Sequence, residues 1–171
     1  MATKTLMSVE EYLHTSFDGC DCEYVNGEIV ERNLGKAQHG KIQAKLIQLL
    51  GLLEATLGLQ VIAEIRIHVS PTRYRIPDIG VWLRDAIVGD DIPSSPPFLA
   101  IEILSPEDRW SRMLVKIGEY LECGVQWIWA IDPDAREARC FSQRHPTGTL
   151  CDTLPTENPA IEIPLSQILN R

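Results

Sequence analysis

Two carboxylates within strand-like apolar runs are the residues of this sequence best suited to chemistry. Glu102 lies at the centre of the run FLAIEIL, and Asp78 follows Pro77 in RIPDIGVWL. Because side chains alternate along a strand, each carboxylate is expected on a largely apolar face. Burying an ionised carboxylate without a partner costs several kcal/mol or more, so a compensating cation is expected beside each.

The compensating cation could be a divalent metal ion or the side chain of an arginine or lysine. Two carboxylates on neighbouring strands raise each other's pKa unless a cation lies between them. Oxygen ligands of high negative charge favour Mg²⁺ or Mn²⁺ over zinc. Structural ion pairs with Arg or Lys imitate such sites, so a purely structural pairing stays open as the alternative.

Lys116 is a third candidate. The helix-like segment SRMLVKIGEYLECG has an apolar face that includes Met113, Ile117 and Tyr120, and Lys116 lies at the edge of that face. A lysine there can bury its stem and direct its ammonium towards the strand ends. Near a phosphodiester it would orient the attacking water or neutralise developing charge. A solvated lysine at a helix edge is the alternative reading.

The elements that must position these residues follow from local patterns. Ser8 and Glu11 have capping-box spacing, which predicts an opening helix, and Asn26-Gly27 predicts a hairpin. An apolar stripe predicts a helix over 36–57 that ends at Gly58 and has His39 in its first turn. Strands are predicted at 59–69, 74–83, 98–104, 125–132 and 137–142.

Three further segments complete the expected chain. The polar, proline-rich segment 85–97 is expected to be a loop, and Ser105-Pro106 is expected to begin the helix that ends near Gly124. The tail is expected to hold one strand near Ile161 and a short final helix. Because strands alternate with helices, the predicted class is mixed α/β or α+β around one central sheet.

Composition limits the classes of function. The 171 residues suit one domain, 1–171, and neither a signal peptide nor a membrane-spanning stretch is apparent, so we expect a cytoplasmic protein without membrane association. The five cysteines lack framework spacing and are expected to stay reduced. A net charge of −8 argues against a broad basic surface for nucleic acid, so any such contact must be local or aided by cations.

The ordered motifs resemble a known family. The PD of 77–78, the EILSP of 102–106, Lys116 and the GVxxxWxxDP pattern up to 133 together look like the Uma-type restriction-endonuclease family of the PD-(D/E)XK superfamily. The upstream EYVNGEIVE and the helix of His39 also match, so the resemblance covers roughly residues 8–141. It implies a restriction-endonuclease-like core, a central mixed β-sheet flanked by helices, and Mg²⁺-dependent hydrolysis of DNA.

The resemblance also implies roles for single residues. Asp78 and Glu102 would be metal ligands, assisted by the backbone carbonyl of Ile103, and Lys116 would be the catalytic cation. The lysine usual in the superfamily two residues beyond the Glu is here Leu104, and Lys116 on the following helix takes its place.

Other residues could join this site. Glu23, which should pair with Val30 across the hairpin, and His39 are further candidates; an ordinary strand carboxylate and a core histidine are the equal alternatives. Tyr120 is expected to pack beside Lys116. Arg109 and Arg112 could contact a phosphate.

Two further hypotheses remain at this point. A catalytically inactive nuclease fold acting as a binding or assembly module is favoured by the net charge and by Leu104. A homodimer would suit cleavage of two strands, with apolar surface around Trp127 and Trp129 as its candidate interface.

Overall fold

A six-stranded mixed sheet forms the centre of the described part of the chain. The computed structural model describes residues 6–33, 35–84 and 92–169. The strand order is β10-β9-β8-β7-β6-β3, in which only β7 and β8 are parallel neighbours. The strands are β3 (Leu59–Ala63), β6 (Ile79–Leu83), β7 (Leu99–Ile103), β8 (Trp127–Asp132), β9 (Glu137–Ser142) and β10 (His145–Leu150).

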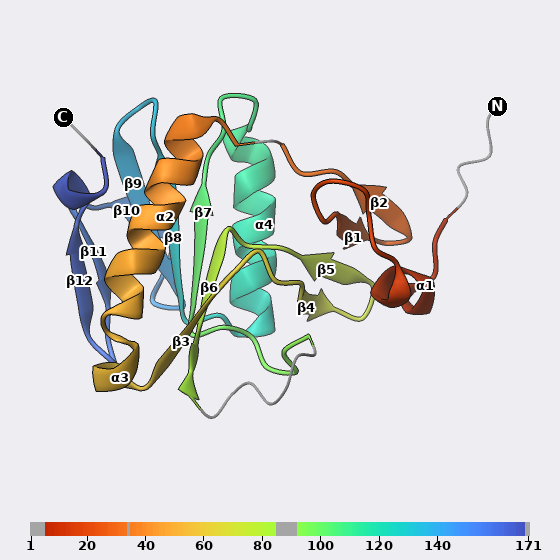
Figure 1. Ribbon diagram of the computed structural model, residues 1–171, viewed down its shortest axis with the longest axis horizontal. Coiled ribbons are helices and arrows are strands. Elements are labelled where there is room, and N and C mark those ends of the chain that lie inside the picture. Colours follow the sequence, from red (N-terminus) through yellow and green to blue (C-terminus); the bar gives the residue numbers. More distant parts are fainter. Residues whose placement is uncertain (1–5, 34, 85–91, 170–171) are drawn as a thin grey trace.

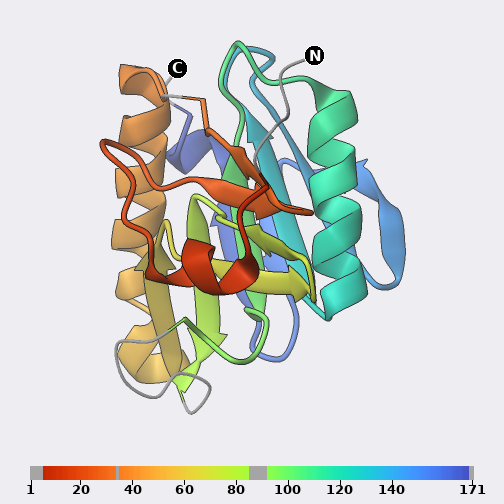
Figure 2. The ribbon, with the colours of Figure 1, turned by 90° about the vertical axis from the view of Figure 1, so that its right-hand side faces the viewer.

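Two helices cover opposite faces of this sheet, α2 (Ala37–Gly51) and α4 (Trp110–Cys123) (Figures 1 and 2). The helix α2 buries Ile42, Leu46 and Leu50 against one face. The helix α4 buries Met113, Ile117 and Tyr120 against the other face. This arrangement confirms the predicted class of a central mixed sheet flanked by helices.

A second sheet of the described residues lies beside the first, in the order β2-β1-β5-β4 (Figure 1). It consists of β1 (Glu23–Val25), β2 (Glu28–Val30), β4 (Ile67–Ser70) and β5 (Arg73–Arg75) and packs against α1 (Val9–His14). The predicted capping box of Ser8 and Glu11 is confirmed. So is the hairpin, because Asn26 and Gly27 both have positive φ, as a type I′ turn requires.

Two of the predicted strands are each divided into two, and the two breaks are neighbours in space. The strand expected over 59–69 divides into β3 and β4 at Glu64, which has φ 53°. The strand expected over 74–83 divides into β5 and β6 at Pro77, which has no N–H to give to a ladder. The amide of Glu64 donates to the carbonyl of Asp78 (3.3 Å), so the two segments lie side by side where each passes from one sheet to the other. Asp78 therefore precedes β6 instead of lying within a strand.

The helix boundaries also differ from prediction in two places. The segment 36–57 forms α2 and then a short α3 (Glu54–Leu57), which ends at Gly58 as expected. The helix α4 begins at Trp110 and not at Ser105. The carboxylate of Asp108 accepts a hydrogen bond from the Ser105 amide (2.6 Å) and closes a separate turn before the helix. The predicted end of α4 at Gly124 is confirmed.

The C-terminal segment contains more strand than predicted. The strands β11 (Thr153–Thr156) and β12 (Ile161–Pro164) form a hairpin that is followed by the 3₁₀ turn η2 (Leu165–Gln167). Trp129, proposed above as dimer surface, is fully buried, and its indole donates to the Pro155 carbonyl (2.9 Å). Trp129 is therefore not available as interface, because β11 covers it, whereas Trp127 is half-buried; the interface and the homodimer stay predictions. Of the expected loop 85–97, residues 85–91 lie outside the described residues.

Candidate active site

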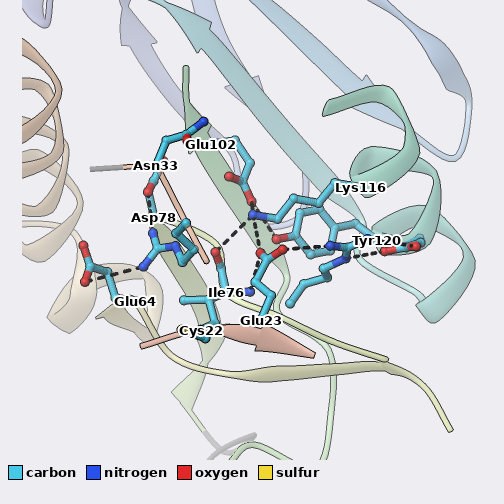
Figure 3. A network of polar contacts seen from close by, with 12 residues as sticks. Cys22, Glu23, Asn33, Glu64, Ile76, Asp78, Glu102, Lys116 and Tyr120 are labelled. Carbon is cyan, nitrogen blue, oxygen red and sulfur yellow. Dashed lines mark hydrogen bonds and ion pairs between the residues drawn. The ribbon is translucent and has the colours of Figure 1, made fainter. Parts of the chain in front are cut away.

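The breaks in the two strands open onto a cavity of about 530 Å³ between the two sheets and α4. Its lining includes the five side chains predicted as metal-binding or catalytic residues: Glu23, His39, Asp78, Glu102 and Lys116. Ile103 lines it as well. Figure 3 shows how Glu23, Asp78, Glu102 and Lys116 converge from different elements. The structure therefore brings together residues that are separated by up to 93 positions in the chain.

Glu102 is the fourth residue of β7 and contacts side chains of α4. Its Oε1 accepts a hydrogen bond from the Tyr120 hydroxyl (2.6 Å) and contacts the Lys116 ammonium (2.8 Å). Burial nevertheless raises the pKa of Glu102 to about 7, because the attraction of Lys116 is opposed by the negative charges of Asp78 and Glu23. Glu102 is thus a buried carboxyl that titrates near neutral pH.

Lys116 is shared between two carboxylates. Its ammonium lies 2.7 Å from Glu23 Oε1 and 2.8 Å from Glu102 Oε1, and it donates to the Ile76 carbonyl (3.2 Å). Burial would lower the pKa of Lys116, but the two carboxylates outweigh it and raise that pKa above its ordinary value. Lys116 is therefore a fixed positive charge and not a proton donor or acceptor near neutral pH.

Glu23 has several other partners. Arg75 contacts its Oε2 (2.8 Å), and the Ile76 amide donates to its Oε1 (3.0 Å). Burial acts to raise the pKa of Glu23, but Lys116 and Arg75 together lower it below the ordinary value. Arg75 is in turn held by Glu119 of α4 (2.6 Å). Glu23 thus remains charged and fixes the position of Lys116.

Asp78 is also fully engaged. Arg32 contacts its Oδ1 (2.8 Å), while His39 (3.2 Å) and the Ile103 amide (2.7 Å) contact its Oδ2. Burial acts to raise the pKa of Asp78, but the hydrogen bond and charge of His39, with Lys116, lower it overall. The hydrogen bond to Asp78 raises the pKa of His39 in return. Asp78 is therefore an ionised carboxylate held by the side chains of Arg32 and His39.

Comparing these carboxylates shows where positive charge is short. Asp78 contacts Arg32 and His39, Glu23 contacts Arg75 and Lys116, and the pKa values of both carboxylates are lowered. Glu102 shares its one contacting cation, Lys116, with Glu23, and its pKa is raised. An added cation beside Glu102 would stabilise its ionised form.

The donor chemistry of the cavity suits a hard divalent cation. Mg²⁺ is typically held by one or two carboxylates and keeps several waters. Asp78 and Glu102 supply two carboxylates to one cavity, and the amide of Ile103, the residue after Glu102, donates to Asp78 (2.7 Å). Within residues 6–33, 35–84 and 92–169, no group of three or more His, Cys, Asp and Glu side chains is arranged to hold a metal ion. Two carboxylates at one cavity are the donors that the described residues offer to such a cation.

The outer lining of the cavity carries charges of both signs, because the exposed Glu31 and the half-buried Asp108 line it as well as two arginines. The exposed residues Arg109, Ser111 and Arg112, around the start of α4, line it together with Asn33. Asn33 reaches across to Asp108 (2.7 Å). Arg109 and Arg112 therefore offer two exposed positive charges that a phosphodiester could contact, beside the negative charges of Glu31 and Asp108.

Sequence reasoning missed three members of this network. Tyr120 was expected only to pack beside Lys116, but its hydroxyl also donates a hydrogen bond to Glu102. Arg32 and Arg75 were not singled out. Alternation along 73–76 could have placed Arg75 beside Glu23, whereas no local pattern connects Arg32 to Asp78, which lies 46 residues away.

Comparison with known proteins agrees with this fold. The family model described as "Uma2: Putative restriction endonuclease" matches residues 9–168, so the chain belongs to that family. A solved structure, titled as a putative nuclease belonging to DUF820 from Anabaena variabilis, is similar with a TM-score of 0.83 and 20% identity. The similarity covers 95% of this chain and 97% of that one.

Two further results complete the comparison. A search of curated proteins gave no match. No helix in the described parts of the chain is long and apolar enough to span a membrane. Family membership supports a nuclease, which is a hydrolase that acts on nucleic acid.

Proposed function

We propose that the protein is a metal-dependent endonuclease that hydrolyses phosphodiester bonds of DNA. The observation that supports this proposal is the convergence of Asp78, Glu102 and Lys116 on one cavity, in which Glu102 lacks full compensation of its charge. Asp78 and Glu102, with the carbonyl of Ile103, would hold Mg²⁺ or Mn²⁺. Such a cation polarises a phosphoryl oxygen and lowers the pKa of a bound water when present.

The chain's own residues have separate tasks in this proposal. Lys116 stays charged and stabilises the negative charge that develops on the phosphate. Glu23 positions the Lys116 ammonium, and His39 positions Asp78 by a hydrogen bond to Oδ2. Tyr120 orients Glu102 through its hydroxyl. Arg109 and Arg112 at the cavity mouth would contact neighbouring phosphates.

Lys116 would also replace the lysine that the superfamily pattern has at position 104 and that this sequence lacks. Leu104 stands where the usual lysine would be, and it is buried against α4. Lys116 reaches Glu102 from that helix instead (2.8 Å). The ammonium and the carboxylate therefore meet although their spacing in the sequence is different.

Cleavage of supercoiled plasmid tests the proposal. The wild type is expected to nick and linearise DNA with Mg²⁺ or Mn²⁺ and to stop when EDTA is added. Glu102→Gln and Lys116→Met should lower the rate by about 100-fold or more, the scale of losing a transition-state contact. Glu107→Gln, which changes an exposed carboxylate at the same end of the molecule, is the control. Cleavage that persists in EDTA, or in Glu102→Gln, would refute the proposal.

A non-catalytic binding or assembly module is the second candidate. The observation in its favour is that Asp78 already has Arg32, His39 and the Ile103 amide as partners. This candidate requires DNA or protein binding without any cleavage, and no affinity for Mn²⁺ at millimolar concentration.

A further inference from the structure

Arg32 lies in an unusual position for a residue of a cation site. It follows β2, lines the cavity, and is only 15% exposed. Its Nη2 lies 2.8 Å from Asp78 Oδ1, and its Nη1 lies 3.6 Å from Glu64 Oε2. The guanidinium therefore lies between two carboxylates, one of which is a candidate metal ligand.

The contact with Asp78 conflicts directly with cation binding. Oδ2 is engaged by the Ile103 amide, which is fixed in β7, and by His39. Oδ1 is engaged by Arg32, which cannot lose its charge by deprotonation. A divalent cation at Asp78 must therefore take the place of the guanidinium or accept its repulsion.

Glu64 offers the guanidinium an alternative partner. Its side chain is 47% exposed and lies at the strand break beside Asp78. The amide of Gln43 donates both to Glu64 Oε1 (3.2 Å) and to the Asp78 carbonyl (3.0 Å), so the two acidic residues are held close together. A small movement would let Arg32 leave Asp78 while it keeps Glu64.

We propose that Arg32 is an exchangeable internal cation that occupies Asp78 in the metal-free protein, and that a divalent cation must displace it towards Glu64. This inference rests on the proposed function, since it assumes a cation held by Asp78. It makes Arg32 a positioning residue that sets the affinity of the site for metal. The metal-free protein thereby avoids an uncompensated Asp78, which would destabilise it.

Calorimetric titration of Mn²⁺ into DNA-free protein tests the exchange. Arg32→Gln should bind Mn²⁺ more tightly than wild type by about tenfold, which is the scale of one displaced charge pair. Arg112→Gln is the matched control, because Arg112 has the same charge, lines the same cavity and is exposed. It should change the affinity by less than about twofold. Arg32→Lys keeps the charge and should bind nearly as weakly as wild type.

A double-mutant cycle with Glu64→Gln separates exchange from general electrostatics. Glu64→Gln should weaken Mn²⁺ binding about threefold in wild type, because the displaced guanidinium loses its second partner. The same change in an Arg32→Gln background should have no effect. An equal weakening in both backgrounds would show that Glu64 acts only through its own charge, and would refute the exchange.

The remaining outcomes are distinct. Thermal unfolding of each variant shows whether it is folded, and Arg32→Met, which also removes the charge and should also bind Mn²⁺ more tightly than wild type, replaces Arg32→Gln if that variant is not folded. Tighter binding by Arg32→Gln, or binding by it alone, supports the exchange. Unchanged or weaker binding by Arg32→Gln, beside a wild type that does bind, overturns the exchange and leaves the nuclease proposal intact. Absence of Mn²⁺ binding in all variants, with DNA oligonucleotide also present, overturns both.

Discussion

Two clusters of basic side chains and carboxylates, one around Arg66 and one around Lys116 in the cavity, differ in how completely their charges are paired. Beside α1, Arg66 contacts both carboxylate oxygens of Asp21 (2.6 Å each) and donates to the carbonyls of Tyr12 and Thr15. Its guanidinium also stacks over the Tyr12 ring at 4.3 Å. Arg66 thereby ties α1 and the following segment to the start of β4.

The cavity cluster is different because one cation serves two carboxylates. Lys116 contacts both Glu23 and Glu102, and the pKa of Glu102 stays near 7. In the Arg66 cluster, both oxygens of Asp21 are paired with the guanidinium. In the cavity cluster, Glu102 has only the Lys116 ammonium that it shares with Glu23. The difference indicates that buried charge alone does not mark a site; buried charge without full compensation beside a cavity does.

The largest effect on stability is expected for Lys116→Met. Removing this ammonium leaves Glu23 and Glu102 without their shared partner, and breaking buried pairs costs about 3–5 kcal/mol. Urea unfolding at pH 7.5 should show this loss, and Lys45→Met, an exposed lysine of α2, should be near neutral. Because protonation of Glu102 relieves the imbalance, the loss should be smaller at pH 5. A Lys116→Met protein as stable as wild type would remove the central role given to Lys116.

Arg66→Gln should destabilise the protein by about 2–4 kcal/mol, because Asp21 and two carbonyls lose their donor. Mn²⁺ affinity of the folded variant should not change, in contrast to changes in the cavity. Arg144→Gln, at an exposed ion pair with Glu157, is the control and should have little effect. An altered Mn²⁺ affinity in Arg66→Gln would contradict the separation of anchor and site.

The pH dependence of stability should identify Glu102. Its pKa is about 7 in the folded protein and near 4.5 in the unfolded chain, so the folded state holds more protons between these values. The free energy of unfolding should therefore fall as pH rises from about 4.5 to 7, by on the order of 2 kcal/mol, and level off above.

Glu102→Gln should remove this part of the pH profile. The pKa of His39 is also raised, so its contribution is present below pH 6.5 and is lost as pH rises through its folded pKa. That contribution persists in Glu102→Gln, and the difference between the two proteins isolates Glu102. Identical profiles would contradict the raised pKa.

The smallest effect is expected for Tyr120→Phe. The variant loses the 2.6 Å hydrogen bond to Glu102 and should be less stable by about 1–2 kcal/mol. In a Glu102→Gln background the same change should cost less, and a double-mutant cycle of unfolding free energies measures this coupling. Equal costs in both backgrounds would show that Tyr120 acts only by packing.

Local patterns predicted the parts of the fold whose causes are local. The capping box of Ser8 and the type I′ turn at Asn26-Gly27 depend on neighbouring residues, and both are confirmed. The end of α4 at Gly124 is confirmed for the same reason. The predicted start of α4 was wrong because the backbone of Arg109 is extended (φ −109°, ψ 128°), so the turn closed by Ser105 and Asp108 does not continue into the helix.

The strand breaks at Glu64 and Pro77 could not be predicted from alternation alone. Each strand continues in the other sheet after its break, so the apolar pattern runs on across it. The same limit applies to the site. Motif spacing identified Asp78, Glu102 and Lys116 as candidates, whereas the contact of Arg32 with Asp78 depends on how the two sheets meet. The metal-binding and catalytic roles remain predictions.

Calorimetric titration of Mn²⁺ into wild type, Glu102→Gln and Asp78→Asn tests the central claim most directly. We expect one Mn²⁺ to bind the wild type and both variants to lose that binding by at least about tenfold, since each lacks one of two carboxylate ligands. Binding should also raise the thermal midpoint of the wild type alone. Mn²⁺ binding that survives in both variants, or its absence from the wild type with and without DNA, would contradict a cation site between Asp78 and Glu102.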